Sequence, residues 1–303
     1  VLAHPTVGSK AFLIHIADRS VGGLSVRDQM VGPHQVPVSD CAITLKDYQG
    51  EAGTVMAMGE RTPLAIWDAS ASVRMAIGEA LTNLAGVAIA DCQRIKLSAN
   101  WMAAAGQEGQ DAQLRAAVEA ASEWSQALGL AIPVGKDSLS MHTQWGGQEG
   151  SQPKSQVTSP VSLIVSAFAA IDSVAQHVTP ALQSTPSSLW LVDFSLASGP
   201  RLGGSILSQV LSGEDHHSLG EVPDAPPPQQ LLSLLRLCWQ WVQEGRLLAC
   251  HDRSDGGVFS TVFEMALAGH CGVRMHVPEL NSDEEVLAWL LNEELGLVLQ
   301  VSD

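Results

Sequence analysis

An almost entirely apolar stretch, residues 71 to 90, most limits what this chain can fold into, because a helix without a polar side has to be buried inside a core. Its only charged residues are Arg74 and Glu79. Glu79 and Asn83 lie four positions apart, so they share one face of the helix. A buried carboxylate is costly unless a cation or a metal ion compensates it. The sequence therefore predicts a positive charge beside Glu79, and Arg74, five residues back, is poorly placed to supply it.

Strand and helix signals alternate along the first half of the chain. Asp68 and Ser70 are typical capping residues before the apolar stretch, and Gly129 is a typical stop for a second helix. Strand-to-loop passages are expected around 95–102 and 132–142, and the composition of 146–160 indicates a loop. The expected strands are 41–48, 95–102 and 162–171, and the expected helices are 71–90 and 111–128.

The second half begins after residues 178–188, which are rich in Thr, Ser and Pro, as linkers between domains often are. We expect a first domain at 1–177 and a second, truncated domain at 189–303. In the second domain the expected strands are 189–195, 247–251 and 295–301, the expected helices are 206–211, 231–244 and 258–269, and an acidic, proline-rich surface loop covers 213–230. The fold class predicted from this order is α+β, or mixed α/β.

Net charge and cysteine usage exclude several classes of protein. The chain has 32 acidic and 16 basic residues, a net charge of −16, so it repels nucleic acid and anionic membranes. Five widely spaced cysteines without a Cys-x-x-Cys pair indicate a reducing compartment. No apolar run has the length of a membrane span. We therefore expect a soluble, cytoplasmic protein, and a first residue other than Met suggests a fragment of a longer one.

The stretch HDRSDGG, residues 251–257, places carboxylates between a strand and a helix. Helix starts that contain glycine bind phosphate well, but carboxylates repel phosphate, so a metal ion would have to mediate the contact. Asp40, Glu79, Asn83 and Asp252 together offer the hard oxygen ligands that Mg²⁺ prefers. The alternative is that Asp252 only forms the turn or caps the helix.

Other candidate motifs carry weaker signals when they are taken alone. Residues 134–141 place Lys136 beside Gly135 and ahead of Ser138, but they lack the spacing of a Walker-type phosphate loop. A polar turn with a solvated lysine is the favoured interpretation, and Lys10 is likewise ordinary on its own. The ten histidines show no zinc-binding spacing.

Taken together and in order, seven motifs resemble those of phosphoribosylformylglycinamidine synthase of the large, glutamine-hydrolysing type. The resemblance covers nearly the whole chain and corresponds to the second half of the synthetase region. The motifs are DRSVGG (18–23), QMVGPHQVPVSD (29–40), GEALTNL (78–84), KLSANWM (96–102), VGKDSLSM (134–141), RLGGS (201–205) and HDRSDGG (251–257).

The resemblance implies a fold and a set of partners. The fold would be a two-domain half of the aminoimidazole ribonucleotide synthetase type, with an N-terminal domain that forms a β-barrel with the matching half. The partners would be that first synthetase half and a glutaminase domain of the same polypeptide, together with a nucleotide. No nucleic acid or membrane is expected.

The resemblance also implies a reaction of purine biosynthesis. ATP phosphorylates the amide oxygen of formylglycinamide ribonucleotide, and ammonia from glutamine displaces the phosphate to give formylglycinamidine ribonucleotide. In this half, Mg²⁺ would bind Asp40, Glu79, Asn83 and Asp252.

The nucleotide of this half, ATP or ADP, would be auxiliary rather than turned over. Lys10, Ser39 and Ser254 would contact it, the last of these beside Asp252. The loop of Gly135, Lys136, Asp137 and Ser138 would reach toward the substrate site. No catalytic residue is assigned to this half, because the catalytic histidines belong to the first half and the glutaminase cysteine to another domain. The isolated fragment is expected to be inactive.

Two alternatives to a ligase fragment remain. One is a non-catalytic structural or interaction protein with the same fold, against which the apparently intact metal-binding positions argue. The other is a kinase-like member of the same superfamily, such as a selenophosphate or thiamine phosphate enzyme. Those proteins are shorter and lack this set of motifs.

Overall fold

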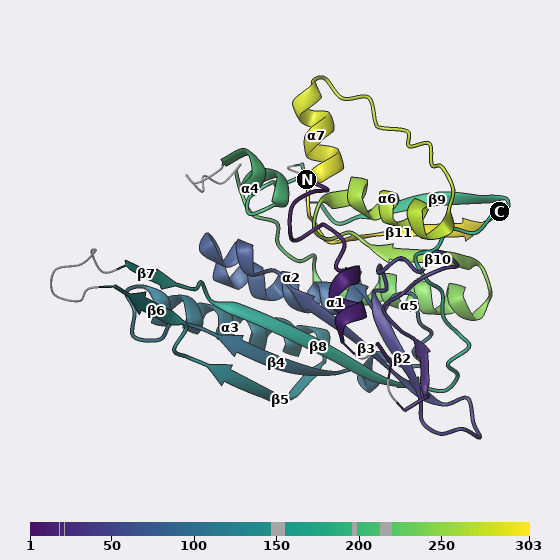
Figure 1. The fold of residues 1–303 in the computed structure, drawn as a ribbon, viewed down its shortest axis with the longest axis horizontal. Helices are drawn as coiled ribbons and strands as arrows, with labels where there is room; N and C mark the ends of the chain where they lie inside the picture. The colour runs from purple at the N-terminus through teal and green to yellow at the C-terminus, as the bar shows by residue number, and fades with distance from the viewer. Residues whose placement is uncertain (18, 21, 147–154, 196–198, 213–219) are drawn as a thin grey trace.

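Two β-sheets and the helices packed against them form the molecule (Figure 1). The computed structural model describes residues 1–303 except 18, 21, 147–154, 196–198 and 213–219. The mixed α/β class expected from the sequence is confirmed. Among the described residues, every helix is too short or too polar to cross a bilayer.

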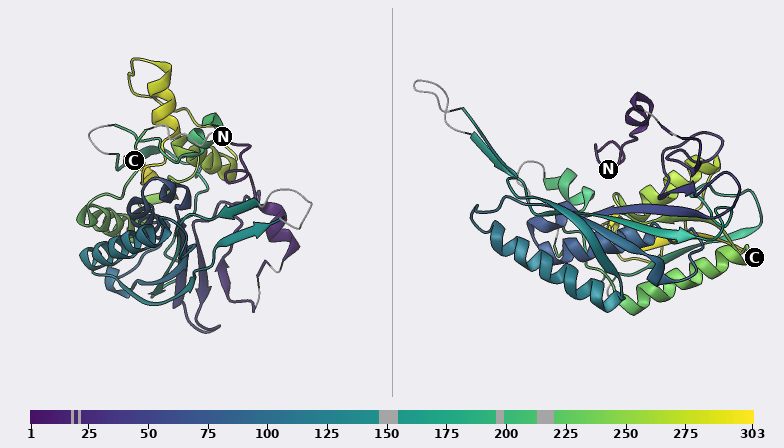
Figure 2. Two further views of the ribbon diagram at one scale, coloured as in Figure 1. Left: turned by 90° about the vertical axis from the view of Figure 1, so that its left-hand side faces the viewer. Right: turned by 90° about the horizontal axis from the view of Figure 1, so that it is seen from below.

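The larger sheet has six strands in the order β1-β2-β3-β8-β4-β5. Neighbouring strands are antiparallel except β4 and β5, which are parallel because helix α3 returns the chain to the start of the sheet between them. The strands are β1 Ser25–Arg27, β2 Cys41–Leu45, β3 Gly53–Glu60, β8 Ser162–Ile171, β4 Lys96–Met102 and β5 Ala131–Ser138. A short ribbon of β6 (His142–Trp145) and β7 (Ser155–Thr158) extends away from this sheet (Figure 2).

Helices α2 (Ala69–Thr82) and α3 (Gln110–Leu128) cover one face of the larger sheet (Figure 2). Alternate residues of the central strands, such as Val55 and Val165, point to this face and are buried. Their neighbours on the opposite face, such as Met58 and Phe168, are exposed. The sheet has β1 and β5 as its edges and, over the residues that the structure describes, does not close into a barrel.

The smaller sheet lies between two layers of helix. It has the antiparallel order β10-β11-β9, with helix α5 and the main core on one side and helix α6 on the other. Its strands are β9 Ser187–Asp193, β10 Leu247–Asp252 and β11 Gly296–Ser302. The remaining helices are α1 Ala11–Ile16, α4 Ile206–Ser212, α5 Pro228–Gln243, α6 Gly257–Gly269 and α7 Asp283–Leu291, with 3₁₀ turns at Thr62–Ile66 and Cys92–Arg94.

One hydrophobic cluster contains residues from both sides of the predicted linker at 178–188. Side chains of α2 and α3 pack in it with those of α5, β10 and β11. The buried indole of Trp239 in α5 donates its Nε1–H to the carbonyl oxygen of Leu84, 3.1 Å away. The two parts of the chain are therefore joined by shared apolar packing, while the domain boundaries at 1–177 and 189–303 stay a prediction.

Several local expectations hold and others are wrong. The Asp68 side chain caps α2 by accepting from Ala71 N, and Gly129 ends α3 in the left-handed conformation, both as expected. Helix α2 ends at Thr82, however, and does not continue to residue 90, because the chain turns at Asn83. The loop expected at 135–138 is instead part of β5, and part of the loop expected at 146–160 is β7. Residues 213–219 of the expected acidic loop lie outside the described residues.

Strand β3 and helix α2 approach so closely that only glycine fits at residue 59. A Cβ atom there would overlap the carbonyl oxygen of Ala76 and the backbone nitrogen of Ala80. The neighbouring residue Glu60 contacts the end of α2 through its backbone. This close approach therefore fixes the distance between the sheet and the helix that carries Glu79.

We expect Gly59→Ala to lower the free energy of unfolding by about 1–3 kcal/mol, because helix and strand would have to separate. Chemical denaturation followed by circular dichroism measures the effect. Gly272→Ala is the matched control, since a Cβ there would meet nothing within 4 Å. Equal stability of the two variants would contradict the role given to Gly59.

Candidate functional site

A cavity of about 760 Å³ lies between the larger sheet and the start of α6. Its walls come from β2, β3, the end of α2, the end of β10 and the turn before α6. The cavity brings together six of the predicted site residues, which are far apart in the sequence: Ser39, Asp40, Glu79, Asn83, Asp252 and Ser254. The predicted residues Gly135, Lys136, Asp137 and Ser138 do not line it, since they lie in the edge strand β5.

Glu79 is positioned by the close contact between α2 and β3. Its Oε2 accepts a hydrogen bond of 2.6 Å from the backbone nitrogen of Glu60. Burial raises the pKa of Glu79 well above its ordinary value, and the positive charge of nearby Arg61 opposes that shift. Arg74 binds both oxygens of Asp224 instead of Glu79. Its spacing from Glu79 had indicated that it is poorly placed to pair with that carboxylate. The cation expected beside Glu79 is therefore Arg61, which the sequence did not identify.

Asn83 presents an unpartnered oxygen next to Glu79. Its Nδ2 donates to the carbonyl oxygen of Met58 over 2.9 Å, which fixes the amide plane. Its Oδ1 is buried and, among the described residues, has no hydrogen-bond donor. A buried amide oxygen without a donor is costly unless a ligand binds it.

His251 is a central residue of the site that the sequence did not predict. Its Nδ1 lies 2.6 Å from Asp40 Oδ1 and 3.6 Å from Asp252 Oδ1, and its Nε2 lies 2.8 Å from Glu264 Oε2. Burial by itself lowers the pKa of His251, but the three carboxylates together raise it well above its ordinary value. Burial, followed by the charge of Asp40, raises the pKa of Asp252 to about 7. The ligand atoms of Asp40, His251 and Asp252 lie within 4.8 Å of one another.

This donor set fits a divalent cation. Oxygen atoms from Asp40, Glu79, Asn83 and Asp252 line one cavity, and the Asn83 oxygen lacks a partner among the described residues. Carboxylate and amide oxygens are the ligands that Mg²⁺ takes in proteins. The cation would also relieve the repulsion that raises the pKa of Asp252.

A second cavity of about 580 Å³ adjoins the first and shares Pro37, Val38 and Glu264 with it. Its other walls come from the N-terminal segment, residues 34–36 and α6 with His270, and they mix apolar side chains such as Val7 and Leu267 with polar ones. Lys10 lies in this second cavity, where its Nζ donates to the carbonyl oxygens of Thr6 and Gly8.

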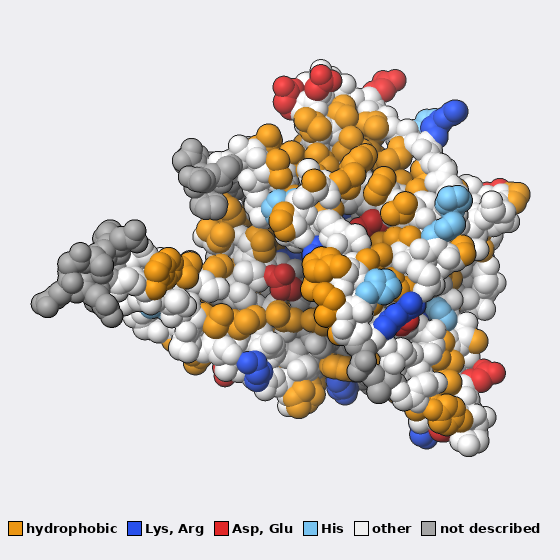
Figure 3. Space-filling view, in the orientation of Figure 1, with side chains coloured by type: hydrophobic (Ala, Val, Ile, Leu, Met, Phe, Trp, Pro, Cys, Tyr) orange, Lys and Arg blue, Asp and Glu red, His pale blue; other side chains and the backbone are white. Residues whose placement is uncertain are grey.

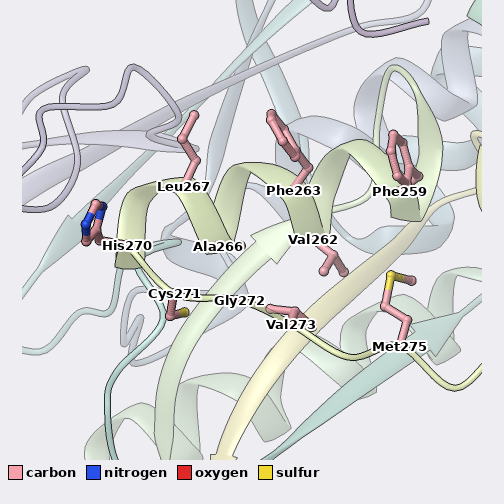
Figure 4. Close-up of a pocket in the computed structure, with 10 residues that line it drawn as sticks. All are labelled: Phe259, Val262, Phe263, Ala266, Leu267, His270, Cys271, Gly272, Val273 and Met275. Carbon is pink, nitrogen blue, oxygen red and sulfur yellow. The ribbon is translucent and has the colours of Figure 1, made fainter.

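A third, apolar cavity of about 520 Å³ runs along α6 and is lined by ten residues of α6 and the segment after it, which Figure 4 labels. Phe259, Phe263 and Leu267 project to one side of the helix, and Val273 and Met275 lie on the other (Figure 4). No carboxylate lines it. The candidate site is therefore the acidic cavity. On the face drawn in Figure 3, acidic and basic side chains are scattered among mostly apolar and uncharged ones.

Buried ion pairs hold the two parts of the chain together behind the acidic cavity. The guanidinium of Arg61, which follows β3, lies 3.1 Å from Glu293 Oε2 and 3.2 Å from Asp255 Oδ1. Glu293 Oε1 accepts from the backbone nitrogens of Gly256 and Ile206. Burial raises the pKa of Glu293 to about 7, and Arg61 opposes the shift. The only sequence signal for this network is the pair of adjacent glutamates, Glu293 and Glu294, just before β11.

Two family models match the chain. The FGAR-AT PurM_N-like domain matches residues 9–170, and the C-terminal domain of AIR synthase related proteins matches residues 195–302.

Solved structures share the fold at low sequence identity. T. maritima PurL complexed with FGAR has a TM-score of 0.62 at 12% identity, covering 90% of this chain and 41% of that chain. PurLQS from Thermotoga maritima has a TM-score of 0.58 at 16% identity, with coverages of 90% and 39%. The HypE-HypF complex has a TM-score of 0.52 at 14% identity, with coverages of 86% and 77%. The chain thus spans about two fifths of the length of these PurL chains.

We expect Arg61→Met to lower the free energy of unfolding by about 3–5 kcal/mol, because it leaves Glu293 buried without its cation. Replacing both residues, as Arg61→Met with Glu293→Met, should recover part of the loss. Arg115→Met, at an exposed pair on α3, is the matched control and should change stability by less than about 1 kcal/mol. Denaturant titration of the four proteins tests this, and an Arg61 variant as stable as the control would contradict it.

Proposed function

The chain belongs to the family of the FGAR-AT PurM_N-like domain, and from this premise we propose that it binds a magnesium nucleotide as part of an ATP-dependent phosphoribosylformylglycinamidine synthase. In that enzyme formylglycinamide ribonucleotide, glutamine and ATP give formylglycinamidine ribonucleotide. The nucleotide of this half is auxiliary, and the chain supplies no catalytic residue. The first synthetase half and the glutaminase domain are its partners, in the cytoplasm.

One observation carries the proposal: oxygen ligands from three separate elements line a single cavity, which adjoins the second cavity that contains Lys10. Asp40 precedes β2, Glu79 and Asn83 lie at the end of α2, and Asp252 ends β10. In a chain with a net charge of −16, such a cavity would repel free phosphate. A bound Mg²⁺ would supply the positive charge that attracts phosphate oxygens and offsets their repulsion from these carboxylates.

The two adjoining cavities suggest how the nucleotide lies. Its phosphates would sit in the acidic cavity near Asp40 and Asp252, and its base and ribose in the more apolar cavity with Lys10. Ser254, in the turn before α6, lines the acidic cavity and would donate to a phosphate oxygen. The Ser39 hydroxyl already donates to the carbonyl oxygen of Cys41, so this residue would contact the nucleotide through its backbone.

Contacts among the side chains of the cavity hold the proposed metal ligands in position. Glu264 and Asp40 hold the ring of His251 from opposite sides, which fixes the Asp40 carboxylate beside Asp252. Residues 135–138 form the end of an edge strand, and we propose that this strand end, rather than a loop, borders the substrate site made with the first half.

We expect ADP to bind the purified chain only in the presence of Mg²⁺, and Asp252→Asn to weaken that binding at least about 10–100-fold, because a direct ligand is lost. Isothermal titration calorimetry with and without EDTA measures both effects. Asp172→Asn, at an exposed carboxylate, is the matched control and should bind as the wild type does.

Absence of binding to the folded wild-type chain would overturn the proposal that this half forms the nucleotide site by itself. A structural protein that has kept only the fold would give that result. Equal binding by the Asp252 variant and the wild type would instead remove Asp252 from the site.

A further inference from the structure

Arg27, the last residue of β1, is a buried guanidinium with an unused donor. Its side chain is 5% exposed. Its Nε donates to the Ser39 hydroxyl over 2.9 Å and its Nη1 to the carbonyl oxygen of Val178 over 2.8 Å. Its Nη2 is buried and has no acceptor among the described residues.

Arg27 also differs from the other buried arginines in its lack of a counter-ion. Arg61 and Arg253 each pair with a carboxylate, whereas no ion pair of Arg27 occurs in the described part of the chain. The adjacent Asp28 is already engaged, since it accepts from Arg19 and from the backbone nitrogen of Met30. A buried charge without a partner costs several kcal/mol, so an anion bound beside Arg27 would stabilise the folded chain.

A separate cavity of about 280 Å³ lies against Arg27 and is lined with hydrogen-bonding groups. Ser25, His177 and Thr179 line it, and Arg19, Ser25, Arg27 and Asp28 also line the acidic cavity. His177 Nδ1 contacts the carbonyl oxygen of Val174 at 2.8 Å. None of the residues that we propose as metal ligands lines this side cavity.

We propose that this side cavity binds a phosphate group through Arg27, either free phosphate or the end of a phosphate monoester. A guanidinium with a free donor matches the geometry of phosphate oxygens, and hydroxyl groups add further donors. The cavity is larger than one phosphate requires, so the rest of a small monoester fits as well. This site borders the acidic cavity and shares lining residues with it, but it contains none of the proposed metal ligands, and its positive charge comes from the protein itself.

Thermal unfolding of the purified chain in EDTA tests the proposal separately from nucleotide binding. Inorganic phosphate should raise the unfolding temperature of the wild type, while chloride at the same ionic strength should not. Arg27→Met keeps the length of the side chain but removes the charge, and it should weaken the phosphate response about tenfold or more. Arg27→Lys should retain part of it, and Arg115→Met should respond as the wild type does.

The outcomes separate the possibilities. A wild type that does not respond to phosphate overturns the proposal, and so does an Arg27→Met response equal to that of the wild type. If Arg27→Met does not fold, the wild-type comparison of phosphate with chloride, together with Arg27→Lys, still decides. A second titration with glycerol 3-phosphate identifies the ligand: a response to both compounds indicates a monoester site, and a response to inorganic phosphate alone indicates a free-phosphate site.

Discussion

The buried pair of Arg61 and Glu293 is the interaction on which the arrangement of the site depends. It joins the residue that follows β3 to the residues that precede β11, and the Glu293 carboxylate also holds the backbone at Gly256, where α6 begins. Buried ion pairs contribute little net stability because both charges lose their hydration. The value of this pair is therefore positional: it fixes the start of α6 and the end of β10 against α2, so that Asp252 faces Glu79 across the cavity.

The sequence predicts local structure well where the signal is local. The Asp68 cap, the Gly129 stop and the strand expected at 162–171 depend on neighbours within a few residues, and the structure contains all three features. The end of α2 was missed because the apolar pattern continues past Thr82, although the chain has turned. An apolar run shows that a segment is buried but does not show its conformation.

The site residues were predicted from the order of the motifs. The residues that were missed are those whose role depends on contacts between segments far apart in the sequence. The motifs directed attention to Asp40, Glu79, Asn83 and Asp252, which do line one cavity. His251 and Glu264 were missed because their importance arises only when β10 brings them beside Asp40. Arg27 was likewise unremarkable until the fold buried it without a counter-ion. Whether a charged side chain has a counter-ion depends on its neighbours in the folded structure, so a single sequence does not reveal which buried charges are unpaired.

The order of the smaller sheet has a consequence for how the protein forms during synthesis. Strand β11 lies between β9 and β10, although it follows both of them in the sequence. Its pairing with β9 closes a loop of about a hundred residues, which is slow because much chain entropy is lost before contacts form. A ribosome-bound chain that has not yet released residues 293–302 lacks the central strand, and Arg61 lacks its buried partner Glu293. Until β11 is available, β9 and β10 therefore lack their common partner, and unpaired strand edges of this kind favour aggregation.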